Sequence, residues 1–238
     1  MSEVKRYGID VSEWQGNICW PKVRESGVAF AMIRATHGLK RDAYFEKNME
    51  AALEAGISVG VYCCSYATTV AGILEEAAYF LETIRPWREE IAFPAAIDAE
   101  QESQFYLGRA AVTELLLTFC EAVVSAGYLP MVYSNCNWLN CVIDQSALTE
   151  NGIDVWVAWP HKVASFAEIP VDGVTKHDHT MWQFSNVGKI DGISGLVDLN
   201  ISYADYAEEA PVLPDRRYVS WEEAAAMLAE LGCEGILL

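Results

Sequence analysis

The chain has 238 residues, of which 52% are hydrophobic, and it can therefore close one sizeable core. Its 34 acidic residues against 16 basic ones give a net charge of −18, which argues against a nucleic-acid partner. No apolar run approaches the roughly 18 to 20 residues that span a bilayer, so we expect no membrane partner.

Eight short apolar runs rich in strand-forming residues predict eight strands. The predicted strands, in chain order, are 7–12, 28–35, 58–66, 92–100, 129–134, 154–159, 180–184 and 196–201. Helical patterns at 20–26, 42–55, 69–84, 109–126 and, more weakly, 137–148 separate the first six strands. Five βα units followed by three strands favour a parallel sheet closed into an irregular TIM-like (β/α)5(β)3 barrel. A doubly wound open sheet is the alternative.

The last thirty residues have a different pattern from the rest. Residues 208–215 form an acidic connector that contains proline, and Ser220 with Glu223 makes a capping box that opens a helix ending by Gly232. So short a segment cannot build a core of its own. We therefore expect a catalytic barrel at 1–207 and, at 208–238, a helical appendage that either docks on the barrel or begins a further module.

The seven cysteines, at 19, 63, 64, 120, 136, 141 and 233, show no CxxC and no metal-ligand spacing. We expect most of them to be small core residues in a reducing compartment, with a bond between Cys136 and Cys141 as the alternative. We also expect no metal and no cofactor. The residues from Met1 to Arg6 lead directly into a strand with no signal-like apolar segment, which predicts synthesis in the cytoplasm.

A pair of acids lies near the end of the fourth predicted strand. Alternation along a strand sends Asp98 and Glu100 to the same face, with Cα atoms about 6.6 Å apart at ~3.3 Å per residue. In a barrel of this type the carboxyl ends of the strands form the catalytic face. The sequence therefore predicts that these two acids share one pocket.

Two more acids occupy comparable positions, Asp10 on the first strand and Asp198 on the last, and these strands are neighbours in a closed barrel. Four converging carboxylates repel one another, which raises the pKa of at least one and keeps a proton available for general-acid catalysis. The alternatives are solvated or helix-capping acids and a carboxylate metal site.

Aromatic residues also lie near these strand ends, and flat rings with a polar edge suit the faces of sugars. The aromatic residues concerned are Trp14, Tyr62, Tyr66, Tyr133, Trp138, Trp159 and Trp182. Each ring taken alone is more often core filling, but as a group beside acids they favour a carbohydrate ligand. Of these we predict substrate contacts for Tyr62, Tyr133, Trp159 and Trp182.

Several blocks resemble glycoside hydrolase family 25, the Chalaropsis-type lysozymes. The blocks that carry the resemblance, within residues 5 to 203, are GIDVSEWQG from Gly8, FAMIRAT from Phe30, VGVY from Val59, the strand from Pro94 to Glu100, VYSN from Val132, WVAW from Trp156, WQFS from Trp182 and VDLN from Val197. Each block alone is weak, but their order and spacing are specific. The vicinal pair Cys63 and Cys64 departs from the family, which more often has aromatic residues there.

The resemblance implies a (β/α)5(β)3 barrel that hydrolyses the β-1,4 bond between N-acetylmuramic acid and N-acetylglucosamine in peptidoglycan. It assigns Glu100 as the general acid and Asp98 as the group that steadies the substrate's 2-acetamido group during a substrate-assisted, retaining reaction. Asp10 and Asp198 would hold sugar hydroxyls and tune this pair. Residue spacing alone leaves direct carboxylate attack and an inverting water open.

Two other functions remain open on the residues alone. One is a cell-wall sugar-binding protein without turnover, and the other is a barrel hydrolase of another β-linked N-acetylhexosamine polymer such as chitin. The leading expectation is a monomeric muramidase that binds peptidoglycan glycan strands. Such an enzyme would reach the cell wall by lysis, by non-classical export or after removal of a leader.

Overall fold

The computed structural model describes residues 5–170 and 178–206, so the predicted appendage at 208–238 lies outside the described residues. The strands are β1 (Arg6–Val11), β2 (Phe30–His37), β3 (Lys40–Arg41), β4 (Ser58–Cys64), β5 (Ile91–Asp98), β6 (Pro130–Asn135), β7 (Asp154–His161), β8 (Met181–Gly188) and β9 (Val197–Ser202). The α-helices are α1 (Trp20–Glu25), α2 (Phe45–Glu54), α3 (Val70–Ile84), α4 (Glu102–Phe105), α5 (Arg109–Ser125), α6 (Cys136–Cys141) and α7 (Gln145–Glu150). Short 3-10 helices lie at η1 (Glu13–Gln15), η2 (Arg85–Trp87) and η3 (Phe166–Glu168).

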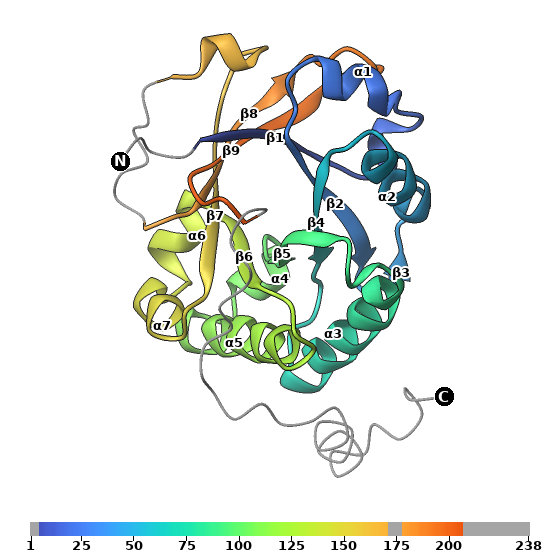
Figure 1. Ribbon diagram of the computed structural model, residues 1–238. Coiled ribbons are helices and arrows are strands. Elements are labelled where there is room, and N and C mark those ends of the chain that lie inside the picture. Colours follow the sequence, from blue (N-terminus) through green and yellow to red (C-terminus); the bar gives the residue numbers. More distant parts are fainter. Residues whose placement is uncertain (1–4, 171–177, 207–238) are drawn as a thin grey trace.

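The sheet closes into a barrel. Its strand order is β1-β9-β8-β7-β6-β5-β4-β2-β3, and β1 also pairs with β2, so eight strands form a ring from which β3 projects as a hairpin partner of β2. The helices α2, α3 and α5 lie around the outside of this ring (Figure 1). The closed ring confirms the expected TIM-like α/β barrel, and the open sheet is wrong.

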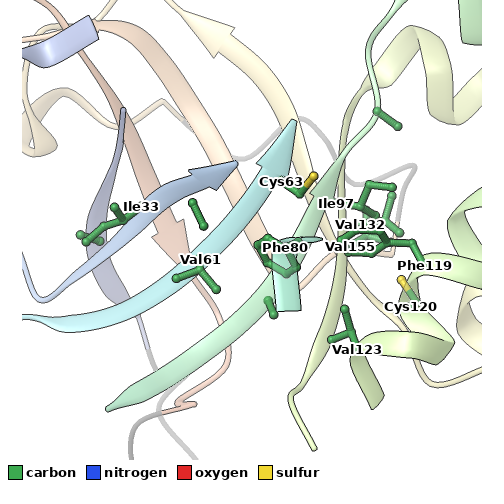
Figure 2. Packing of buried hydrophobic residues seen from close by; sticks show 14 of the residues in the cluster. Ile33, Val61, Cys63, Phe80, Ile97, Phe119, Cys120, Val123, Val132 and Val155 are labelled. Carbon is green, nitrogen blue, oxygen red and sulfur yellow. The ribbon is translucent and has the colours of Figure 1, made fainter. Parts of the chain in front are cut away.

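Alternation along the strands separates two cores. Inside the ring, a small cluster contains Phe30, Met32, Phe93 and Trp156, and the Phe30 and Phe93 rings stack at 4.5 Å between centroids. Outside it, a larger cluster joins the strands to the helices. In Figure 2, strand residues such as Val61, Ile97 and Val132 pack with residues of α3 and α5. Small and apolar residues on both faces explain why the strands read as nearly continuous apolar runs.

The last strand corrects the sequence prediction. Strand β9 is antiparallel to both β8 and β1, whereas the other neighbouring strands of the ring are parallel. The connection at 189–196 is shorter than the dozen or so residues that a parallel crossover needs. The barrel is therefore mixed rather than all-parallel.

The weak helix predicted at 137–148 is also corrected. Two short helices, α6 and α7, replace it, because the Asp144 side chain accepts the backbone N–H groups of Ser146 and Ala147 and caps a new helix there. Cys136 and Cys141 are both free thiols, so they do not form the disulfide weighed as an alternative.

Within residues 5–170 and 178–206, no helix has the length and apolarity required to cross a bilayer.

Candidate active site

The four predicted acids converge at one end of the barrel. Asp10 and Asp98 lie on β1 and β5 at the carboxyl ends of those strands, and Glu100 follows β5 by two residues. Asp198 is placed there by the antiparallel direction of β9, which sets it directly opposite Asp10. Charge interactions link Asp10 to Asp98, to Glu100 and to Asp198. The structure therefore brings all four carboxyl groups into one cluster.

Asp98 is the acid with an unsatisfied atom. Its Oδ1 is buried and has no hydrogen-bond partner among the residues that the structure describes. Burial, and then the charge of Glu100, raises the pKa of Asp98 to about 8, while hydrogen bonding with Cys64 and the charge of Arg34 act in the opposite direction. Asp98 is therefore largely protonated at neutral pH.

Glu100 has a different environment. Its Oε1 accepts a hydrogen bond of 2.7 Å from Asn135 Nδ2. The orientation of this amide is fixed, because Asn135 Oδ1 caps α6 by accepting the backbone N–H groups of Asn137 and Trp138. Burial raises the pKa of Glu100, and the hydrogen bonds from Asn135 oppose that rise. Of the two acids, Glu100 is thus the better placed to be the carboxylate in this arrangement.

Asp10 and Asp198 form a second pair in the cluster, because they face each other across β1 and β9. Burial raises the pKa of Asp10, and hydrogen bonds from Asn200, Gln183 and Asp198 lower it. For Asp198, burial and the charge of Asp10 raise the pKa to about 8. The pair therefore holds a proton near neutral pH, as the sequence predicted for at least one member of the cluster.

A buried ion-pair network supports the rim beside Asp98. Arg34 on β2 donates from Nε to Asp42 Oδ2 at 2.8 Å and from Nη2 to Glu13 Oε1 at 3.1 Å. The side chain of Asp42 is fully buried, and it also accepts the backbone N–H groups of Glu13 and Tyr44. This network ties η1, which carries the exposed Trp14, to the strand that faces Asp98.

Three of the four predicted aromatic contacts lie at or below the mouth. Tyr62 and Tyr133 are half-buried, and both pack edge-on against Trp156, with ring centroids 6.1 and 4.5 Å away. Trp159 on β7 is 48% exposed and thus free to meet a ligand. These positions are compatible with the predicted substrate contacts, which remain predictions.

Trp182 differs from the expectation. It is 0% exposed and belongs to the outer core, where it packs against Phe184, and its Nε1 donates to the Trp159 carbonyl. Alternation along β8 explains this, because the next residue, Gln183, points to the acid cluster. Trp182 therefore supports the strand that carries Trp159 and does not itself face a ligand.

Sequence reasoning gave no role to several residues that bond to the four acids or influence them by charge. These residues are Cys64, Asn135, Gln183 and Asn200, which bond to the acids, and Arg34, whose charge acts on Asp98. The period-2 rule applied to the last strand would have found Asn200, which shares a face with Asp198. The rest depend on strand register, which the sequence does not show.

Among the described residues, no three His, Cys, Asp or Glu side chains are grouped so that they could hold a metal ion.

A barrel with a cluster of buried acids at its mouth is the arrangement that many glycoside hydrolases use. The model of glycosyl hydrolases family 25 matches residues 9–193, and the chain belongs to this family.

Relatives and solved structures agree with this membership. Lysozyme M1 from Streptomyces globisporus is 31% identical over an alignment of 202 residues. The match covers 81% of this chain and 66% of that protein, so the chain spans just under two thirds of this relative. The bacterial lysozyme structure from Streptomyces coelicolor superposes with a TM-score of 0.61 at 25% identity, covering 82% of this chain and 90% of that one. A family 25 glycosyl hydrolase from Bacillus anthracis gives 0.61 and 25%, with 86% and 92% covered.

The raised pKa of Asp98 predicts a pH effect on stability. The folded protein keeps this proton up to about pH 8, whereas the unfolded chain releases it near the ordinary aspartate pKa of 3.8, so this group's contribution to stability is lost as the pH rises between the two values. The free energy of unfolding of the wild type should fall relative to Asp98→Asn by about 1.4 kcal/mol per pH unit in this range. Urea unfolding of both proteins at pH 5, 6 and 7 measures the difference.

The exposed Ser146→Ala variant is the control for this experiment, because it changes no titrating group. A constant difference in unfolding free energy between the wild type and Asp98→Asn from pH 5 to 7 would show that Asp98 is already ionised.

Proposed function

We propose that this chain is a muramidase that cleaves the β-1,4 bond between N-acetylmuramic acid and N-acetylglucosamine in peptidoglycan glycan strands. The observation that carries the proposal is the joining of Asp98 and Glu100, in a family 25 barrel, to Asp10 and Asp198 from strands that close the ring. A binding protein needs no proton donor, whereas glycoside hydrolysis does. The exposed Trp159, near the carboxyl end of β7, suits the face of a sugar ring.

The arrangement suits a substrate-assisted, retaining reaction. Glu100 would protonate the leaving glycosidic oxygen, while the oxygen of the substrate's own 2-acetamido group attacks the anomeric carbon from the opposite face. Asp98 would accept the acetamido N–H and stabilise the positive charge that develops on that group. Water activated by Glu100 would then open the cyclic intermediate and return the same anomeric configuration.

The proton must reach Glu100 before this reaction starts. In the structure, burial raises the pKa of Asp98 to about 8, while the hydrogen bond that Glu100 accepts from Asn135 favours the carboxylate form of Glu100. An acetamido N–H arriving at Asp98 favours its carboxylate form, because a hydrogen-bond donor stabilises the charged acceptor. Substrate binding thus transfers the proton from Asp98 to Glu100 without changing the net charge of the pair.

The choice of polymer tests the proposal against its alternatives. Purified peptidoglycan and purified chitin are incubated with the protein, and the release of soluble reducing sugar is followed. Release from peptidoglycan alone is the expected result. Release from chitin alone identifies a different hexosaminidase, and binding to peptidoglycan with no release identifies a sugar-binding protein.

The stereochemical outcome tests the mechanism separately. Proton NMR of a fresh digest of a soluble wall oligosaccharide distinguishes the two anomers before they interconvert. The β-anomer should appear first if the reaction retains configuration. Initial appearance of the α-anomer would indicate direct attack by water and would contradict the acetamido route.

The barrel of residues 1–207 is proposed to carry the whole reaction. The family match ends at residue 193, and the four acids of the cluster all lie before residue 207. A variant that lacks residues 208–238 should therefore retain wall-solubilising activity within about twofold at a temperature where it is folded. Loss of activity in a folded truncated protein would assign part of the site to the removed segment.

A further inference from the structure

Two buried amides contact Asp10, and the orientation of one of them, Asn200, follows from the hydrogen bond on its other side. Asp10 Oδ2 accepts from Asn200 Nδ2 at 2.8 Å and from Gln183 Nε2 at 2.9 Å. Asn200 Oδ1 accepts from Trp156 Nε1 at 2.8 Å. An indole nitrogen can only donate, so it can face only the oxygen of an amide. The amino group of Asn200 therefore points at Asp10.

Gln183 contacts Asp10 from another strand. Its amino group donates to Asp10, and the Tyr133 hydroxyl lies 3.0 Å from Gln183 Oε1 and donates to it. Gln183 and Asn200 are 5% and 0% exposed, so water does not compete for these bonds. Two N–H donors converge on one oxygen of Asp10, and this favours its carboxylate form.

Asp198 completes the arrangement. It stands opposite Asp10 in the β1–β9 ladder, and burial together with the charge of Asp10 raises the pKa of Asp198 to about 8. Two adjacent buried carboxyl groups repel each other when both are ionised, so the pair retains one proton near neutral pH. Because the amide donors face Asp10, this proton lies on Asp198, and the pair carries one negative charge.

Among the described residues, no cation is shown to stabilise the carboxylate form of Asp10. Asp98 and Glu100 face it from the end of β5, and the Tyr62 and Tyr133 hydroxyls face it from β4 and β6. None of these is positively charged. The cation Arg34 acts on Asp98 and Tyr62, and it is bound to Asp42 and Glu13.

We propose that Gln183 and Asn200 are positioning residues, bonded to Tyr133 and Trp156, which hold Asp10 as the anion and Asp198 as the neutral acid of a one-proton pair. This inference rests on the proposed function, in which the pair binds a sugar. The free oxygen of neutral Asp198 accepts a sugar hydroxyl, and the missing second charge limits repulsion against Asp98 and Glu100. The Tyr133 hydroxyl is then engaged by Gln183, so only the Tyr133 ring can contact the substrate.

Carboxyl NMR tests the proposal without relying on activity. Aspartate labelled with carbon-13 at the side-chain carboxyl is incorporated, and the Asp10 and Asp198 resonances are assigned with Asp10→Asn and Asp198→Asn. In the wild type, Asp198 should titrate near pH 8 and Asp10 should show the ionised shift at neutral pH. In Asn200→Leu, the protonation midpoint of Asp10 should rise by about one pH unit, because a donor to the charged form is lost.

Trp156→Phe is the second variant, because it keeps an aromatic ring and removes only the N–H that orients Asn200. It should shift Asp10 in the same direction by a smaller amount, and a purely packing role of Trp156 would not move it. Asn48→Leu is the control, since Asn48 is a buried amide on α2, outside the barrel. The pH profile of hydrolysis should shift with the NMR midpoint.

A shift in Asn200→Leu and Trp156→Phe with none in Asn48→Leu supports the proposal. Unchanged Asp10 and Asp198 titrations in either folded site variant overturn it, and so does an equal shift in Asn48→Leu. Because the titrations are read without substrate, a protein that fails to hydrolyse peptidoglycan would refute the proposed function and leave this result standing.

Discussion

Glu100→Gln should lower the rate of peptidoglycan solubilisation by at least about 10³-fold, because a glutamine cannot protonate the leaving oxygen. The side chain keeps its shape and can still accept the hydrogen bond from Asn135, so the fold and the affinity for glycan fragments should be retained. Steady-state release of reducing sugar, with fragment affinity measured by calorimetry, gives both quantities.

A matched control for this variant lies two residues further along the chain. Glu102 is exposed in the first turn of α4, and Glu102→Gln should leave the rate within about twofold. An aryl glycoside substrate adds a second check, because a good leaving group needs little protonation and should lose much less activity in Glu100→Gln than the natural polymer does. Equal losses on both substrates would show that Glu100 does not act as the acid.

Asp98→Asn should lower the rate by about 10²-fold or more, through loss of the negative charge that stabilises the acetamido group in the transition state. The defect should be similar for the aryl glycoside and for peptidoglycan, because attack by the acetamido group is needed to displace either leaving group. The ratio of the two rates therefore separates the roles of Asp98 and Glu100. The measurement is kcat for both substrates in both variants.

Asp144→Asn is the control for this second substitution, because asparagine also caps a helix and α7 should keep its start. A 10²-fold loss confined to Asp98→Asn assigns the effect to the mouth of the barrel. Near wild-type activity in Asp98→Asn would exclude the proposed role of its charge, and the reaction would then need a different route.

The barrel and the acid cluster could be predicted from sequence because both follow from strand periodicity. Placing Asp10 and Asp98 on the inner face needs only alternation, and joining Asp10 to Asp198 needs only ring closure. The position of Glu100 does not follow from alternation alone. Strand β5 ends at Asp98, and the backbone makes one further hydrogen bond, from Ala99 N–H to the Tyr133 carbonyl, before the chain leaves the sheet. The predicted strand was therefore too long, yet Glu100 still enters the cluster.

The errors at the site arise because the type of a side chain does not determine which face of the sheet it occupies. Trp182 was expected at the ligand because it is aromatic, but strand alternation turns it outward and gives the inner position to Gln183. The amides that orient the acids lie on strands far apart in the sequence, and only the register of β8, β9 and β1 brings them together. The antiparallel direction of β9 follows instead from the short connection between β8 and β9, which is too short for a parallel crossover.

The identity of the sugar at the new reducing end tests the central claim most directly. A wall digest by the wild-type protein is reduced with borohydride, and the soluble fragments are analysed by mass spectrometry, with a Glu100→Gln digest in parallel. Fragments that end in reduced N-acetylmuramic acid, absent from the Glu100→Gln digest, are the predicted result. Fragments that end in reduced N-acetylglucosamine, or the same fragments from Glu100→Gln, would contradict a muramidase that works through these acids.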